Sequence, residues 1–170
     1  MADRTKIEWT RSDDGSPGAT WNPVTGCTQV SPGCDHCYAL TLAERFRGAP
    51  NHYFEHGFDV TLRPDKLDQP LRWKRPRKVF VNSMSDLFHS EIPGEYIARV
   101  FAVMALAPRH TFQVLTKRHG RMRSLLSSPA FEDQVRAASS VEFGLDYHGA
   151  WPLPNVWLGV SVEDQKRADL

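Results

Sequence analysis

The sequence has 170 residues, of which 41% are hydrophobic, so the chain can bury one ordinary core and has neither disordered nor fibrous character. Its formal net charge of +1 excludes a general electrostatic attraction to nucleic acids or membranes, so any such binding has to be local. No apolar run approaches the about 20 residues that span a bilayer, and the N-terminus lacks the basic-then-apolar order of a secretory signal. We therefore expect a cytoplasmic protein that does not bind membranes.

The N-terminal part is rich in Gly, Pro, Thr and Ser, a composition typical of loops. There we expect one short strand, Lys6 to Thr10, followed by a long loop that reaches Gly33. From Asp35 onward apolar residues recur at helical spacing, and Gly48 followed by Pro50 provides the stop. A helix is therefore predicted to begin at the last cysteines.

After that helix, short apolar runs alternate with helical patterns. The predicted strands are Phe58 to Leu62, Lys78 to Asn82, Thr111 to Leu115 and Val156 to Ser161, and the predicted helices lie near residues 64–73, 93–106, 118–126 and 162–170. Apolar strands that are each followed by a helix indicate a parallel sheet covered by helices. We expect an α/β fold, a parallel sheet of βα units that forms a partial (β/α) barrel. The chain ends after fewer units than a closed barrel needs, so we also expect a C-terminal truncation.

The whole chain, 1–170, is expected to form a single α/β domain with four parts. Residues 1–36 hold the N-terminal strand and the cysteine loop, and residues 37–126 hold the βα units. Residues 127–155 are predicted to be an irregular insertion with one helix near Phe131 to Ala138. Residues 156–170 hold the last strand and the start of a helix.

The three cysteines are the strongest chemical signal. Cys27, Cys34 and Cys37 follow the spacing C-x6-C-x2-C in a loop rich in Gly and Pro, and their odd number and close spacing argue against a disulfide framework. They are predicted to be the ligands of one metal centre. A 4Fe–4S cluster held by three cysteines leaves one iron open for a chelating cofactor. Zinc needs a fourth ligand, for which His36, His52 and His56 are the nearby candidates, and a third alternative is three unrelated buried thiols.

Several motifs together carry a resemblance to a family. The runs TWNPVTGCTQVSPGCDHCYA, GFDVTLRPDKLDQPLRW, FVNSMSDLFH and TFQVLTKR resemble the phage-associated three-Cys-motif proteins, an uncharacterised family that is itself similar to radical S-adenosylmethionine enzymes. The resemblance covers nearly the whole chain. It implies a radical S-adenosylmethionine-type barrel, a 4Fe–4S cluster and S-adenosylmethionine, and it implies no substrate. The usual pattern of those enzymes is C-x3-C-x2-C, so metal binding follows more directly from this sequence than adenosyl-radical chemistry does.

Polar side chains follow three of the predicted strands. Because the carboxyl ends of parallel strands meet at one edge, where α/β proteins bind ligands, we expect these side chains to form the cofactor site. The predicted cofactor-binding residues are Tyr38, Asn82, Ser83, Ser85, Asp86, Thr116, Lys117, Ser161 and Glu163, with Arg118 as a further candidate for binding an anionic group. For the residues that follow strands the alternative is an ordinary role in capping the next helix. For Tyr38, which directly follows Cys37, the alternative is packing in the core.

Two basic stretches are candidate nucleic-acid contacts. The first combines Trp73 with Arg72, Lys74, Arg75, Arg77 and Lys78, and the second runs from Lys117 to Arg123. Basic and aromatic residues together bind a phosphate backbone and stack bases, but such runs also occur as solvated helix ends. Three histidines, His89, His110 and His119, have no evident partner. The sequence thus leaves three hypotheses open. The first is a cluster-dependent radical enzyme of unknown substrate, for which a nucleic acid is one candidate, and the second is a non-catalytic module that binds zinc or nucleic acid. The third is a degenerate barrel that binds a phage or host partner without chemistry.

Overall fold

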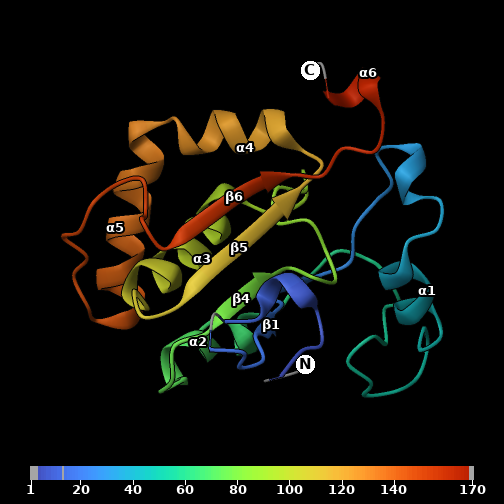
Figure 1. The fold of residues 1–170 in the computed structure, drawn as a ribbon, viewed down its shortest axis with the longest axis horizontal. Coiled ribbons are helices and arrows are strands. Elements are labelled where there is room, and N and C mark those ends of the chain that lie inside the picture. Colours follow the sequence, from blue (N-terminus) through green and yellow to red (C-terminus); the bar gives the residue numbers. More distant parts are fainter. Residues whose placement is uncertain (1–3, 13, 169–170) are drawn as a thin grey trace.

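The computed structural model describes residues 4–12 and 14–168 (Figure 1). It has a mixed α/β fold built on a four-stranded parallel sheet in the order β1-β4-β5-β6. The strands are β1 Ala19–Trp21, β2 Val24–Thr25, β3 Thr61–Leu62, β4 Lys78–Val81, β5 Thr111–Thr116 and β6 Val156–Val160. The helices are α1 Tyr38–Glu44, α2 Gln69–Arg72, α3 Gly94–Leu106, α4 His119–Leu126, α5 Pro129–Phe143 and α6 Gln165–Ala168. The predicted α/β class and parallel sheet are confirmed, and the described strands form an open sheet.

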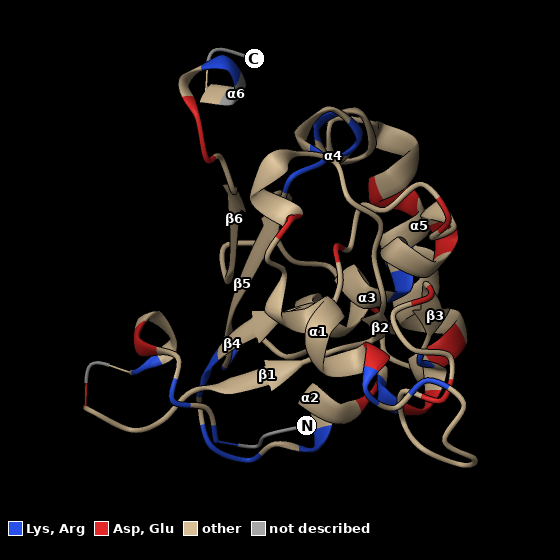
Figure 2. Cartoon of the chain, turned by 90° about the vertical axis from the view of Figure 1, so that its right-hand side faces the viewer, with Lys and Arg blue, Asp and Glu red and all other residues tan. Residues whose placement is uncertain are grey.

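The main core lies between the sheet and the helices. Alternate residues of β4 and β5, such as Val79 and Val114, are fully buried, as the period of a strand with one covered face requires. They pack against α3, which is buried on almost every side because α5 covers it in turn. Figure 2 shows α3 and α5 on the same side of the sheet. Within the described residues, no helix combines the length and hydropathy needed to cross a membrane.

The first strand of the sheet lies where the sequence predicted a loop. The prediction of a strand at Lys6 to Thr10 was wrong: residues Glu8–Thr10 form a turn of 3-10 helix, closed by a hydrogen bond from Thr10 Oγ1 to the Ile7 carbonyl. The edge strand is instead β1, whose Trp21 is fully buried and donates from Nε1 to the Lys66 carbonyl at 2.7 Å. Strand pairing follows burial more than local propensity, so the Gly- and Thr-rich composition concealed this strand.

A second strand was placed in the wrong sheet. The predicted parallel strand Phe58 to Leu62 is reduced to β3, which pairs antiparallel with β2 in a separate two-stranded sheet. Phe58 lies before it and packs in a small second core under the cysteine segment with Ala39, Ala43 and Met84. The segment around Phe58 and β3 therefore packs under the cysteine loop and supplies no strand to the parallel sheet.

The remaining elements agree closely with the pattern analysis. Helix α1 begins directly after Cys37, as predicted, and α3, β5, α4 and β6 lie within a few residues of their predicted positions. Residues 64–72 contain two short helical pieces, Pro64–Lys66 and Gln69–Arg72, and each has a proline in its first turn. Helix α5 is longer than the predicted segment Phe131 to Ala138, and Gly144 in the left-handed region ends it.

Candidate functional site

The cysteine loop is held at the carboxyl edge of the parallel sheet. In Figure 1 the arrowheads of β5 and β6 point toward the side of the molecule where α1 lies. Gly26 donates its N–H to the Met84 carbonyl and Cys27 donates to the Phe58 carbonyl, so the first cysteine is anchored beside the segment that follows β4. Gly26 has φ +86°, and a Cβ there would lie 2.1 Å from the Asp59 carbonyl oxygen, so only glycine fits this crossing.

The other two cysteines are positioned by local turns. Cys34 ends a 3-10 turn that begins at Pro32, and the N–H of Cys37 bonds back to the Cys34 carbonyl at 3.2 Å. Cys37 also precedes the first residue of α1, so the helix fixes its direction. All three thiols line one pocket of about 220 Å³ at the ends of β4, β5 and β6.

Almost every predicted cofactor-binding residue lies in the wall of that pocket. The residues that line it are Tyr38, Asn82, Ser83, Ser85, Asp86, Thr116, Lys117, Arg118 and Ser161. Apart from Tyr38, which begins α1, they lie at or after the ends of three neighbouring parallel strands, which is where the sequence placed them. Tyr38 is itself held against this wall by a hydrogen bond from its hydroxyl to the Ser83 carbonyl.

Asn82 is a buried polar side chain of this wall that lacks hydrogen-bond partners in the described structure. It is 3% exposed, and within the described structure neither its amide nitrogen nor its amide oxygen has a hydrogen-bond partner. Its backbone is also in the left-handed region, with φ +60°. Buried amides are nearly always satisfied, and strained backbone concentrates at functional sites, so Asn82 has the character of a residue that meets a ligand.

Asn22, at the end of β1, supports the same segment. Its Oδ1 accepts from the N–H of Met84 at 3.0 Å, and its Nδ2 donates to Ser83 Oγ at 3.1 Å. These bonds join two strand ends that are about sixty residues apart in sequence. The spacing of the sequence gave no signal for this role.

Asp86 has a structural part in the wall. Its Oδ1 accepts from Thr116 Oγ1 at 2.7 Å and from the Phe88 N–H at 3.0 Å. Its Oδ2 accepts from the Lys117 N–H at 3.0 Å and from Arg118 Nη1 at 3.2 Å. Four donors converge on one carboxylate, so Asp86 ties the end of β5 to the segment after β4.

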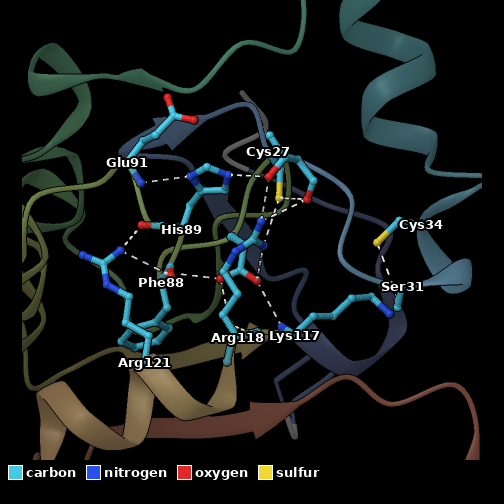
Figure 3. Close-up of polar contacts among 12 residues, drawn as sticks. Cys27, Ser31, Cys34, Phe88, His89, Glu91, Lys117, Arg118 and Arg121 are labelled. Carbon is cyan, nitrogen blue, oxygen red and sulfur yellow. Dashed lines mark hydrogen bonds and ion pairs between the residues drawn. The ribbon is translucent and has the colours of Figure 1, made fainter. Parts of the chain in front are cut away.

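Arg118 connects this carboxylate to the cysteine loop (Figure 3). Its guanidinium lies 3.4 Å from Cys27 Sγ and donates to the carbonyl and the hydroxyl of Thr28, both at 3.0 Å. His89 reaches the same Thr28 hydroxyl at 2.7 Å. Since His89 Nδ1 accepts from the Glu91 N–H, the neutral ring carries its proton on Nε2 and donates to Thr28. Burial lowers the pKa of His89, which favours this neutral form.

Glu163 lies beside the pocket, outside its wall. Its carboxylate accepts from Lys117 Nζ at 2.6 Å and from the Gly33 N–H at 3.3 Å, so it joins the segment after β6 to the cysteine loop. The hydrogen bond from Lys117 is the main reason that the pKa of Glu163 falls to about 2. A Cβ on residue 33 would lie 2.7 Å from this side chain. Because Gly33 has no Cβ, the loop can come this close to Glu163.

The thiols have unequal surroundings. Burial raises the pKa of Cys27, and the nearby Arg118 guanidinium opposes that rise. For Cys34, burial acts in the same direction but is outweighed by hydrogen bonding at Val30 and Ser31 and by the charge of Lys117, so its pKa is lowered. The three cysteines are free thiols in the described structure.

Comparison with known proteins places the chain in a family. Residues 4–170 match the family model described as "Protein of unknown function (DUF5131)". The chain belongs to the DUF5131 family. It matches no curated protein and no solved structure. The prediction of an uncharacterised family is therefore confirmed, whereas its phage association and its likeness to radical S-adenosylmethionine enzymes stay predictions.

A zinc ion and an iron–sulfur cluster place different demands on the three thiols of this DUF5131 protein. Within residues 4–12 and 14–168, no group of three or more His, Cys, Asp or Glu is arranged to hold one metal ion. Zinc–sulfur bonds of about 2.3 Å in a tetrahedron would bring the thiols to about 3.8 Å from each other. A cluster spreads its cysteine ligands over several irons around a larger body. Three thiols that line one pocket are of the ligand type that an iron–sulfur cluster takes.

The histidines suggested for zinc lie away from this arrangement. His52 stacks on Phe46 with ring centroids 3.9 Å apart, and its Nδ1 accepts from the Phe54 N–H. His36 and His56 are exposed. None of the three lines the cysteine pocket.

The first basic stretch lies at the opposite edge of the sheet of the DUF5131 chain. It leads into the amino end of β4, whereas the pocket is at the carboxyl end. Arg77 stacks over Trp73 at 4.9 Å and Lys78 lies 5.9 Å from the Trp157 ring centroid, while Arg72 pairs with Asp68. The stretch therefore does not extend the cysteine site.

The second basic stretch is largely turned inward. Arg118 is bound at the cysteine loop, and Arg121 donates to the carbonyls of Phe88, His89 and Ile92. These bonds fix the segment after β4 against α4. Arg123 is exposed, but because Arg118 and Arg121 are bound to protein groups this stretch offers little of the open cationic surface that the sequence suggested.

Proposed function

We propose that the protein holds a 4Fe–4S cluster through Cys27, Cys34 and Cys37, and that the adjoining pocket binds S-adenosylmethionine. The observation that carries the proposal is one pocket that contains all three thiols together with the buried, unpartnered amide of Asn82. A metal centre would explain why three thiols share the pocket, and a second ligand beside it would explain the unpartnered amide.

The chain's own residues divide into two roles. Asp86 binds Arg118, and Glu163 binds the N–H of Gly33 in the cysteine loop. Because they hold the loops around the pocket together, we assign these three residues to the frame of the site. Asn82 and Ser161 stand at the ends of β4 and β6 and supply the amide and hydroxyl groups that suit the amino group, carboxylate or ribose of the cofactor. When bound, the cluster would supply one electron to the sulfonium of the cofactor.

The apolar members of the wall support the same assignment. Phe58, Phe80 and Leu115 also line the pocket. Such a mixture of a few polar groups with an apolar lining is typical of small-molecule sites and restricts water. At about 220 Å³ the pocket is smaller than the about 300 Å³ at which known ligand sites begin, so by itself it would enclose only a part of a nucleoside cofactor.

The decisive experiment is anaerobic reconstitution with iron and sulfide. We expect about four irons per chain, the absorption and electron paramagnetic resonance of a 4Fe–4S cluster after reduction, and a change in that resonance when S-adenosylmethionine is added. The variants Cys27→Ala, Cys34→Ala and Cys37→Ala should each lose the cluster. Stoichiometric zinc with no cluster would overturn the proposal and favour the zinc-binding module.

The cofactor half of the proposal is tested at Asn82. Asn82→Gly removes the amide but allows the positive φ, so the loop is expected to fold and hold the cluster while the response to S-adenosylmethionine weakens. Asn82→Ala removes the same group and adds backbone strain, so comparison of the two variants separates the amide from the backbone. An unchanged response in Asn82→Gly would remove this residue from the site. Release of 5′-deoxyadenosine under reducing conditions would extend the proposal from binding to catalysis.

A further inference from the structure

One cysteine of the loop has a charged donor against its sulfur. Arg118 Nη1 lies 3.4 Å from Cys27 Sγ, whereas the Cys34 sulfur lies 3.8 Å from the neutral Ser31 hydroxyl. Figure 3 shows the guanidinium of Arg118 pointing to Cys27 from the start of α4. Cys27 and Cys34 are therefore held in electrostatically different surroundings.

The position of this guanidinium is strongly fixed. The Arg118 side chain is 13% exposed, and it is anchored on Asp86, which is 8% exposed. The opposite side of the guanidinium donates twice to Thr28, which follows Cys27 directly. Bonds on two sides hold the positive end of the ion pair toward the sulfur and the negative end away from it. Charge-assisted bonds of this kind in a half-buried site are stronger than neutral ones.

We propose that Arg118 is a positioning residue that fixes the Cys27 thiolate and raises the reduction potential of the metal centre bound there. The inference rests on the proposed function. Reduction adds one electron to the centre and makes its sulfur ligands more negative, so a nearby cationic donor stabilises the reduced state more than the oxidised one. Hydrogen bonds to the ligand sulfurs are among the factors that set the potentials of iron–sulfur clusters.

The test compares the one-electron midpoint potential of the reconstituted protein with those of three variants, in a titration with dithionite as the reductant. Arg118→Met removes the charge and the donor, and we expect at least a tenfold shift of the equilibrium toward the oxidised cluster, which corresponds to a fall of about 59 mV. Arg118→Lys keeps the charge but lacks the planar fork, so its potential is expected between the two. Arg123→Met, on the same helix but exposed, removes the same charge and should leave the potential unchanged.

The outcomes separate this inference from the one beneath it. A wild-type chain that takes up no cluster overturns the proposed function and this inference together. A wild-type cluster whose potential is the same in Arg118→Met overturns this inference alone. If Arg118→Met does not load, Arg118→Lys decides: a lowered potential supports the role, and a potential equal to that of the wild type refutes it.

Discussion

Asp86→Ala is expected to lower the free energy of unfolding by about 3 kcal/mol. Removing one partner of a buried ion pair typically costs about 3 to 5 kcal/mol, because the other charge is left without compensation. Asp86 is 8% exposed and accepts four hydrogen bonds, but Arg118 keeps its bonds to Thr28 and some exposure, which places the cost at the lower end. Urea unfolding followed by circular dichroism gives the value directly.

A double-mutant cycle shows whether the ion pair is the cause. If it is, Asp86→Ala with Arg118→Met should be less destabilising than the sum of the single changes by at least about 1 kcal/mol. Asp146→Ala is the matched control, since Asp146 is exposed in a loop and its loss should change stability by less than about 0.5 kcal/mol. A loss of less than about 1 kcal/mol in Asp86→Ala, or additive single changes, would refute the reasoning that the carboxylate is the central tie of this edge.

Three further predictions concern pH, backbone and loop closure. Burial lowers the pKa of His110 below its ordinary 6.5, so below that pH the unfolded chain takes up a proton that the folded chain refuses, and stability falls. His110→Gln should therefore lose less stability than the wild type between pH 8 and about pH 5.5 in urea titrations, and equal losses would contradict this. Gly26→Ala places a Cβ 2.1 Å from a backbone oxygen at φ +86° and should disrupt folding of the cysteine loop, whereas Gly15→Ala, at φ +78° with open space, should cost only about 1 kcal/mol. Glu163 holds the cysteine loop by accepting hydrogen bonds from Gly33 and Lys117, and Glu163→Gln removes the charge that strengthens these bonds. The loop should then open more readily, so alkylation of Cys34, followed by mass spectrometry, should become faster. An unchanged alkylation rate would mean that the loop is closed without this contact.

The site was predictable from the sequence because it depends on a property of all parallel sheets. The carboxyl ends of neighbouring strands meet at one edge, so Asn82, Thr116 and Ser161 could be placed together before their strands were observed. The cysteines could be placed directly before a helix, because the pattern identified α1 as beginning after Cys37. These are consequences of topology, which apolar periodicity reports well.

Other parts depend on contacts that no local pattern records. β1 has three residues, all buried, and its short sequence resembles the loop around it. His89 has a role through Thr28, and the two are 61 positions apart in the sequence. The segment predicted as a strand at Phe58 fits a strand pattern as well as β4 does, but Phe58 packs with Cys27 and Cys37 in the second core and β3 pairs with β2. Tertiary packing decided each of these cases against local preference.

The polar strand ends also show why a site can be located more easily than its members can be assigned. Asn82 and Asp86 were predicted on the same ground, yet the carboxylate of Asp86 is saturated by four donors while both amide atoms of Asn82 are unpartnered. Ligand binding and loop support call for the same residue types, because both use hydrogen bonds at a buried edge. The difference lies in whether the protein itself satisfies the group. Asn82→Gly should therefore weaken ligand binding with little effect on stability, whereas Asp86→Ala should act first on stability.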